Sequence, residues 1–296
     1  MCDFIIPYDL QVSDFGSVMV LFAKIRYLAN LRRIVKPKTK GAAMKRKFLP
    51  LWIMFFIYFF CYMTMEINLS ILLSLWVTGL SLYLLIKNKL PAKKEILLSV
   101  IFALLVAVSY VGLQRGIRAT LLNGLVSGIP TLFCSLALFS VMQKHTEIKL
   151  ISTGKKNAPL ISILIAVASG LILASVNCLL MAGSNTVDFG ISFSRLLICL
   201  SPAIYEEIAC RSIFWTFCVY LLGNEKPTKF QQFTILFMMS FPHTVAHNYD
   251  IVSTILLCIL FGLPFTFLQK KRDITSAMIS HGLVDAIRFT IFGLGL

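Results

Sequence analysis

Charged side chains are scarce in this chain of 296 residues. They make up 14% of the sequence, whereas hydrophobic residues make up 58% and the mean hydropathy is +0.84. An ordinary soluble domain carries about a quarter charged residues and is about half apolar. The apolar residues here are grouped into runs long enough to cross a bilayer, and the charged residues fall between the runs. The composition therefore argues against a soluble protein and favours one domain embedded in a membrane.

Acidic residues are the scarcer of the two charged classes, since 13 Asp and Glu stand against 28 Lys and Arg for a net charge of +15. None occurs between Asp14 and Glu66, whereas ten basic residues lie between Lys24 and Lys47. Basic residues beside membrane spans remain on the cytoplasmic side and attract anionic lipid headgroups. We therefore expect residues 1–47 to be a basic cytoplasmic N-terminal extension, and we expect no nucleic-acid partner.

The sequence also lacks paired cysteines and a signal peptide. Its eight cysteines are scattered through apolar segments without a C-x-x-C pair, and buried cysteine commonly serves as a small hydrophobic residue. A disulfide framework is therefore not expected. The first twenty residues have no basic start ahead of an apolar stretch, so we expect no cleavable signal peptide either.

Nine apolar segments are candidate membrane spans. They are residues 48–65, 68–86, 96–114, 119–142, 159–182, 191–222, 230–247, 252–268 and 274–294. The segment 191–222 is too long for one straight span and contains Pro202, which predicts a break or a re-entrant start. The expected fold is an all-α, polytopic helical membrane protein with about eight transmembrane helices. Residues 48–190 would form the N-terminal helices, and residues 191–296 a catalytic core in the C-terminal half.

The basic residues of the loops predict the orientation. Alternate loops are basic, with Lys87, Lys89, Lys93 and Lys94, then Lys144, Lys149, Lys155 and Lys156, then Lys226 and Lys229, then Lys270, Lys271 and Arg272. The gaps at 64–67, 183–190 and 248–251 contain no Lys or Arg, and only the gap at 115–118 breaks the alternation. The positive-inside rule then places the N-terminus in the cytoplasm and the C-terminus outside, in a multi-pass protein of the cell membrane.

Ionisable residues gather in the last hundred residues, within apolar surroundings. They are Glu206, Glu207, Arg211, His243, His247, His281, Asp285 and Arg288. A charge inside a membrane span costs at least a few kcal/mol, so it is usually paired or functional. We therefore expect the chemistry to lie in this part of the chain.

The first cluster of these residues is Tyr205-Glu206-Glu207-Ile208-Ala209-Cys210-Arg211. On a helix, Glu207 and Arg211 share a face, with the acid in the favourable N-terminal position for an ion pair. Glu206 is rotated about 100° away and is left free for another partner. An ion pair that only fixes helix packing would explain Glu207 and Arg211, but it would not explain Glu206.

The second cluster places His243 and His247 four residues apart, on one helix face. This spacing suits metal ligation. The zinc-protease pattern H-E-x-x-H is absent, because Thr244 stands where that pattern has Glu. Two histidines that only satisfy packing remain the alternative.

The third cluster sets His281 and Asp285 four residues apart, with Arg288 three residues further on. Asp285 can accept a hydrogen bond from the imidazole and fix its tautomer, or it can pair with Arg288. The alternative is a His–Asp contact that only stabilises the helix and has no part in catalysis.

In order, E-E-x-x-x-R, a histidine near the end of an apolar helix and H-x-x-x-N/D resemble the signature of the CAAX protease and bacteriocin-processing family. These intramembrane endopeptidases are also called the Abi family or type II CAAX prenyl endopeptidases. The resemblance covers about residues 190–290. It matches the first motif in full, and the third through His281 and Asp285. In the second motif, F-x-x-x-H, alignment on Ser240 favours His247 and leaves His243 where the family has Phe.

The resemblance implies an intramembrane protease that acts on a membrane-associated or prenylated protein or peptide. It implies that Glu206 is the general base, acting on a water that the histidine of the second motif also holds. His281 and residue 285 would bind the oxyanion. Since ionised Asp cannot donate a hydrogen bond as Asn does, we expect Asp285 to orient His281 instead, unless it is protonated.

Several alternatives remain open. The two carboxylates and the histidines could hold zinc, although we expect no cofactor because each histidine has a role without metal. A non-catalytic scaffold, such as a bacteriocin self-immunity or regulatory protein, could use the same residues to lock helices together. A carrier could use them as a proton relay, but the acids lie in one half of the chain, without the repeated halves typical of transporters.

Overall fold

The computed structural model describes residues 47–64, 68–113, 116–154, 157–183 and 186–294. These residues are 81% helical and contain no strand, which confirms the all-α fold. The predicted N-terminal extension lies outside the described residues except for Lys47. None of the seven described cysteines forms a disulfide.

The nine predicted segments all form helices, and their ends differ from the predicted ones by at most three residues. The elements are α3 (Leu49–Thr64), α4 (Leu69–Lys87), α5 (Lys93–Ser109) with the 3-10 turn η2 (Tyr110–Leu113), α6 (Ile117–Met142), α7 (Ala158–Ala182), α8 (Phe193–Ile198), the π-helix η3 (Pro202–Ser212), α9 (Ile213–Leu222), α10 (Lys229–Ala246), α11 (Ile251–Leu257), the π-helix η4 (Cys258–Gly262), α12 (Leu263–Lys271) and α13 (Ile274–Phe292). Within the described residues, five helical stretches are long and apolar enough to cross a membrane: 69–87, 93–113, 117–142, 158–182 and 251–271. The chain is thus a multi-pass membrane protein, and the total of about eight spans stays a prediction.

At the predicted break the helix changes form but does not stop: α8 ends at Ile198, Cys199 and Ser201 keep helical backbone angles, and a wider helix begins at Pro202. Proline has no backbone N–H to continue the preceding helix. From Pro202 to Ser212 the chain is a π-helix, in which the N–H of Ile213 bonds to the carbonyl of Ile208, five residues back. Such widened turns occur frequently at functional sites. Every residue of η3 is buried.

Side-chain caps fix the start of two helices that carry site residues. The Thr228 hydroxyl accepts a hydrogen bond from the Gln231 N–H at the start of α10, and the Thr228 N–H donates to Gln231 Oε1 at 2.9 Å. The Asp273 carboxylate accepts from the Ser276 N–H at 2.8 Å at the start of α13. These bonds satisfy N–H groups that have no partner within the helix.

Close packing of α13 against α7 depends on small residues. The buried residues of α7 are Ala158, Ser162, Ala166, Gly170 and Ala174, at intervals of four. A Cβ at Gly170 would lie 3.0 Å from the Ser280 carbonyl oxygen, so a larger residue there would crowd the backbone of α13. Small residues serve this purpose at helix interfaces in membranes.

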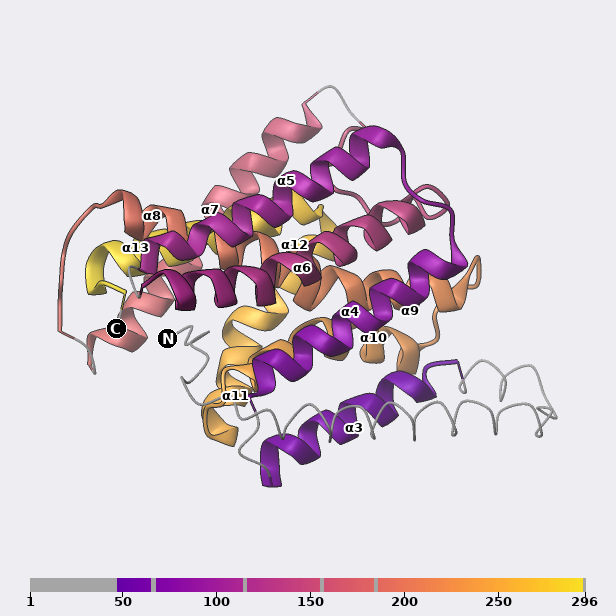
Figure 1. Cartoon of the computed structure of the whole chain (residues 1–296), viewed down its shortest axis with the longest axis horizontal. Coiled ribbons are helices and arrows are strands. Elements are labelled where there is room, and N and C mark those ends of the chain that lie inside the picture. Colours follow the sequence, from indigo (N-terminus) through magenta and orange to yellow (C-terminus); the bar gives the residue numbers. More distant parts are fainter. Residues whose placement is uncertain (1–46, 65–67, 114–115, 155–156, 184–185, 295–296) are drawn as a thin grey trace.

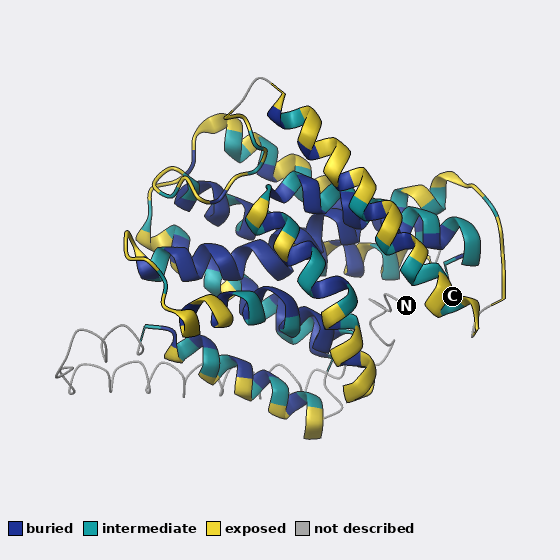
Figure 2. Cartoon of the chain, turned by 180° about the vertical axis from the view of Figure 1, so that it is seen from behind, coloured by how far each residue is buried: buried dark blue, intermediate teal, exposed yellow. Residues whose placement is uncertain are grey.

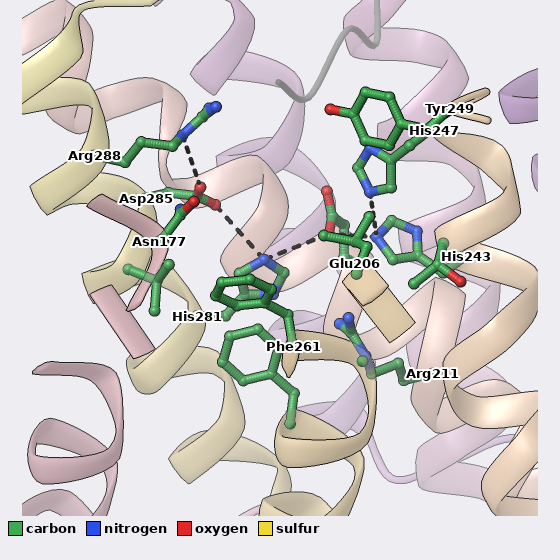
Figure 3. A pocket seen from close by; sticks show the side chains of 15 residues that line it. Asn177, Glu206, Arg211, His243, His247, Tyr249, Phe261, His281, Asp285 and Arg288 are labelled. Carbon is green, nitrogen blue, oxygen red and sulfur yellow. Dashed lines mark hydrogen bonds and ion pairs between the residues drawn. The ribbon is translucent and has the colours of Figure 1, made fainter. Parts of the chain in front are cut away.

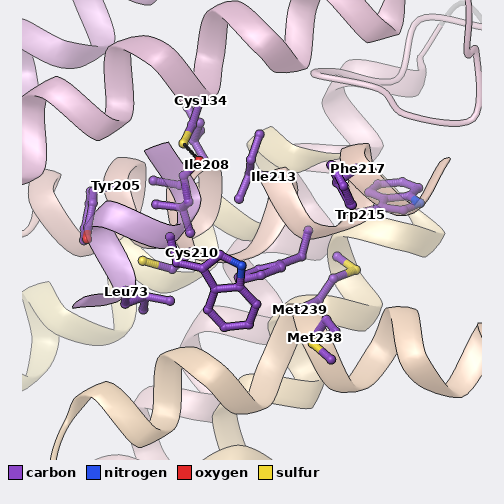
Figure 4. Packing of buried hydrophobic residues seen from close by; sticks show 14 of the residues in the cluster. Leu73, Cys134, Tyr205, Ile208, Cys210, Ile213, Trp215, Phe217, Met238 and Met239 are labelled. Carbon is purple, nitrogen blue, oxygen red and sulfur yellow. Dashed lines mark hydrogen bonds between the residues drawn. The ribbon is translucent and has the colours of Figure 1, made fainter. Parts of the chain in front are cut away.

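The helices enclose η3 (Figure 1), which packs against α13, α6, α10 and α4. Figure 2 shows buried residues at the centre and exposed ones on outer helix faces. The large side chains exposed on α7 include Leu164, Leu171 and Leu179, as expected for a surface that faces lipid. On the apolar side of η3, Tyr205, Ile208 and Cys210 pack in the main core (Figure 4). This packing turns the acids of η3 towards α10, α12 and α13.

Candidate active site

Glu207 is the centre of a fully buried polar cluster. Its carboxylate pairs with Arg211 in the same π-helix and accepts a hydrogen bond of 2.7 Å from Gln269 Nε2 of α12. Its Oε1 also lies 2.6 Å from Nδ1 of His281 on α13. Glu207 is 0% exposed. The ion pair with Arg211 follows the predicted spacing, but Glu207 also fixes three helical elements to one another.

Glu206 lies between two imidazoles, one from α10 and one from α13. Its Oε2 is 2.6 Å from His243 Nε2 and 3.5 Å from His281 Nε2. The residue is 2% exposed. Arg211 pairs with Glu207, whereas Glu206 contacts His243 and His281, as the helix geometry predicted.

His247 lies one step further from Glu206 than His243 does. Its Nε2 is 3.3 Å from His243 Nε2, and its ring stacks on Tyr249 with an interplanar angle of 6°. The histidine that contacts Glu206 directly is thus His243, whereas alignment on Ser240 favoured His247. His247 is the C-cap residue of α10, directly after its last residue Ala246, so it lies one turn further along this helix than His243.

Asp285 does not hold His281 in the way the sequence suggested. Its Oδ2 is 3.6 Å from His281 Nε2, whereas Glu207 is at hydrogen-bond distance from Nδ1 of the same ring. Arg288 Nε lies 3.6 Å from Asp285 Oδ1. Within the described part of the chain, Asp285 Oδ2 and Arg288 Nε have no hydrogen-bond partner. Glu207 therefore orients the imidazole of His281, and Asp285 lies between that ring and Arg288.

A cavity of about 80 Å³ (Figure 3) is lined by all the predicted site residues except Glu207, namely Glu206, Arg211, His243, His247, His281, Asp285 and Arg288. A buried water needs roughly 10–15 Å³ of such space and several polar partners, so the cavity has room for several waters. The lining includes Asn177 of α7, Tyr249 and Phe265 in addition to the predicted residues. The Phe265 ring stacks on His281 with centroids 4.4 Å apart.

Sequence reasoning did not find Asn177, Tyr249 or Gln269. Asn177 is a polar residue within an apolar predicted span, and this could have indicated a role in the site. Gln269 directly precedes the basic residues Lys270 and Lys271, so it looked like part of a solvated loop. Tyr249 offered no signal.

One group of donors has the composition of a metal site. Ligand atoms of Glu206, His243 and His247 all lie within 4.8 Å of one another, and zinc takes carboxylate and imidazole ligands. Two ligands of a tetrahedral zinc would lie roughly 3.4 Å apart, given bonds of about 2.0–2.1 Å. The two histidine nitrogens meet this at 3.3 Å, but Glu206 and His243, at 2.6 Å, would have to separate. The donor set therefore suits zinc, whereas its present spacing suits direct hydrogen bonds.

Comparison with known families places this site in a recognised domain. Residues 189–287 match the family model described as type II CAAX prenyl endopeptidase Rce1-like. The match covers about a third of the chain, from the loop before α8 to α13, and it confirms the resemblance inferred from the motifs. No curated protein and no solved structure matches the chain.

Proposed function

We propose that this chain is an intramembrane endopeptidase that hydrolyses a peptide bond in a membrane-associated or prenylated, CAAX-type protein or peptide. The observation that carries the proposal is the position of Glu206. A buried carboxylate lies between two imidazoles and lines a cavity with room for water. This arrangement is in the segment that matches a family of CAAX-type intramembrane proteases.

Glu206 is the general base in the proposed mechanism. It accepts a proton from a water in the cavity while the water oxygen attacks the carbonyl carbon of the scissile bond. His243 holds the carboxylate at 2.6 Å and so orients it towards the water. When the tetrahedral intermediate collapses, the proton on Glu206 passes to the leaving amine, and the carboxylate is regenerated.

His281 stabilises the oxyanion in this mechanism. The role requires the imidazolium form, in which Nδ1 donates to Glu207 and the Nε2 proton faces the cavity. Glu207 fixes that orientation from 2.6 Å, and donors held in place in this way contribute strongly to transition-state stabilisation. An ionised Asp285 offers no proton, so His281 is the donor.

A second form of the reaction would use zinc, and the grouping of Glu206, His243 and His247 is the observation that favours it. Bound there, the ion would supply a Lewis acid and lower the pKa of a bound water. We propose the metal-free form, because the 2.6 Å contact between Glu206 and His243 already gives both groups a partner.

The proposal is tested by cleavage of a candidate peptide in membranes that contain either the wild-type protein or Glu206→Gln. Glutamine keeps the shape of the side chain but cannot take the proton. We expect product from the wild-type protein only, at equal amounts of inserted protein. Full activity in Glu206→Gln would remove the mechanism. A wild-type protein that binds the peptide without cleaving it would favour the non-catalytic scaffold.

A further inference from the structure

The loops at one end of the helix bundle lie together and are strongly basic. Lys144 Nζ donates to Asn88 Oδ1 at 3.1 Å, the Ser152 N–H donates to Asp273 at 2.9 Å, and Lys47 pairs with Glu225 at 3.2 Å. We call this end the basic face. It carries Lys47, Lys87, Lys89, Lys93, Lys94, Lys144, Lys149, Lys226, Lys229, Lys270, Lys271 and Arg272 among the described residues, against Glu95, Glu147, Glu225 and Asp273. In Figure 1 these helix ends lie towards the right and the top.

The other end of the bundle has almost no free positive charge. Its loops are also tied together, because the Asp188 N–H donates to the Ile291 carbonyl at 2.9 Å and the Tyr62 hydroxyl donates to the Tyr249 carbonyl at 2.5 Å. We call this end the opposite face. Its described basic residues are Arg118, Arg195 and Arg288. Arg195 pairs with Asp188, and the buried Arg288, near the end of α13, lies 3.6 Å from Asp285.

The catalytic cavity opens towards the opposite face. Its half-buried lining residues are Asn177, His247, Tyr249 and Leu257, and the other lining residues are buried. Asn177 lies five residues before the end of α7, and Tyr249 lies in the loop after α10. At the inner end, Arg211 and Phe265 are only 2% and 1% exposed, and they close the cavity on the side of the basic face.

Short basic loops beside membrane spans remain in the cytoplasm, so the basic face is the cytoplasmic one. We infer that the substrate enters from the non-cytoplasmic side and presents its scissile bond there. The substrate class is then a translocated peptide, or a membrane protein cut in the outer half of the bilayer or just beyond it. A prenylated C-terminus in the cytoplasm would meet the closed end of the cavity. This inference rests on the proposed protease function and narrows its substrates.

The orientation is tested with a pair of single substitutions, Thr186→Cys in the loop before α8 and Asn224→Cys in the loop before α10. Both positions are exposed and away from the cavity. A membrane-impermeant maleimide is applied to intact cells and to permeabilised cells, with the wild-type protein as the background from native cysteines. We expect Thr186→Cys to be labelled in intact cells and Asn224→Cys only after permeabilisation. The reverse pattern overturns the inference.

The substrate side is tested with two reporters, each a single-span membrane protein that carries a randomised peptide insert beside its span. One reporter has the insert in the cytoplasm, and the other has it on the far side. We expect cleavage of the far-side reporter only, with loss of the product in Glu206→Gln. Cleavage of the cytoplasmic reporter alone overturns the inference but leaves the protease function standing. If neither reporter is cleaved, the protease function fails, and the maleimide labelling still decides the orientation.

Discussion

Of the two adjacent acids, only Glu207 pairs with Arg211, so substitution by glutamine should lower the stability of the fold at Glu207 and the catalytic rate at Glu206. Glu207→Gln keeps the size of the side chain but removes the negative charge opposite Arg211, which is 2% exposed. Removing one partner of a buried ion pair costs about 3–5 kcal/mol, because the other charge is left without compensation. The contacts with His281 and Gln269 are lost or reversed as well, so the cost should lie at the upper end of this range.

This cost should appear in the thermal unfolding of the purified protein in detergent. At about 2–4 °C per kcal/mol, as found for chains of 150–250 residues, a cost of about 5 kcal/mol in Glu207→Gln should lower the Tm by roughly 10–20 °C. It should also reduce the yield. Glu206→Gln is the matched control and should stay within a few degrees of wild type, since Glu206 faces the cavity and compensates no guanidinium.

A double variant separates charge from shape. Glu207→Gln with Arg211→Met removes both charges, and it should recover part of the Tm lost in Glu207→Gln, because replacing a whole buried ion pair is often neutral. Equal Tm values for Glu206→Gln and Glu207→Gln would refute the reasoning that Glu207 holds the helices together.

The remaining predictions concern catalysis, metal and pH. Glu206→Gln should lower the rate of peptide cleavage by about 10²–10⁴-fold, the usual contribution of a general base, with insertion into membranes unchanged. His243→Ala should lose more activity than His247→Ala, because only His243 lies 2.6 Å from Glu206, and equal severe losses would point to two metal ligands. Prolonged treatment with a strong chelator should leave activity intact, and activity that is lost and then restored by zinc would sink the metal-free mechanism. Burial tends to raise the pKa of Asp273, but hydrogen bonds from Ser162 and Ser276 outweigh it and hold this pKa below its usual range. The stability that Asp273 contributes should therefore be complete above about pH 4 and fall as the pH drops further, and Asp273→Asn should lack this component in a series of Tm values against pH.

The sequence alone determined the helices and the region of the site. Lipid offers no hydrogen bonds to the backbone, so long apolar runs must be helical, and all nine predicted segments are. Pro202, which lacks an N–H, marked the place where the helix changes form. Since charge is expensive within a span, the ionisable residues after residue 195 marked the site. The spacing of Glu207 and Arg211 also gave their ion pair correctly.

Only the tertiary structure decided which of these side chains meet. Helical periodicity gives the face of one helix, but it does not give the rotation and tilt of that helix against its neighbours. For this reason the sequence did not decide that His243 contacts Glu206, or that His281 turns its Nδ1 to Glu207 and not to Asp285. The widening of η3 to a π-helix also had no signal in the sequence, because it depends on the packing around it. Gln269 joined the site for the same reason: its neighbours along the chain are basic, and only the packing of α12 against η3 places its amide on Glu207.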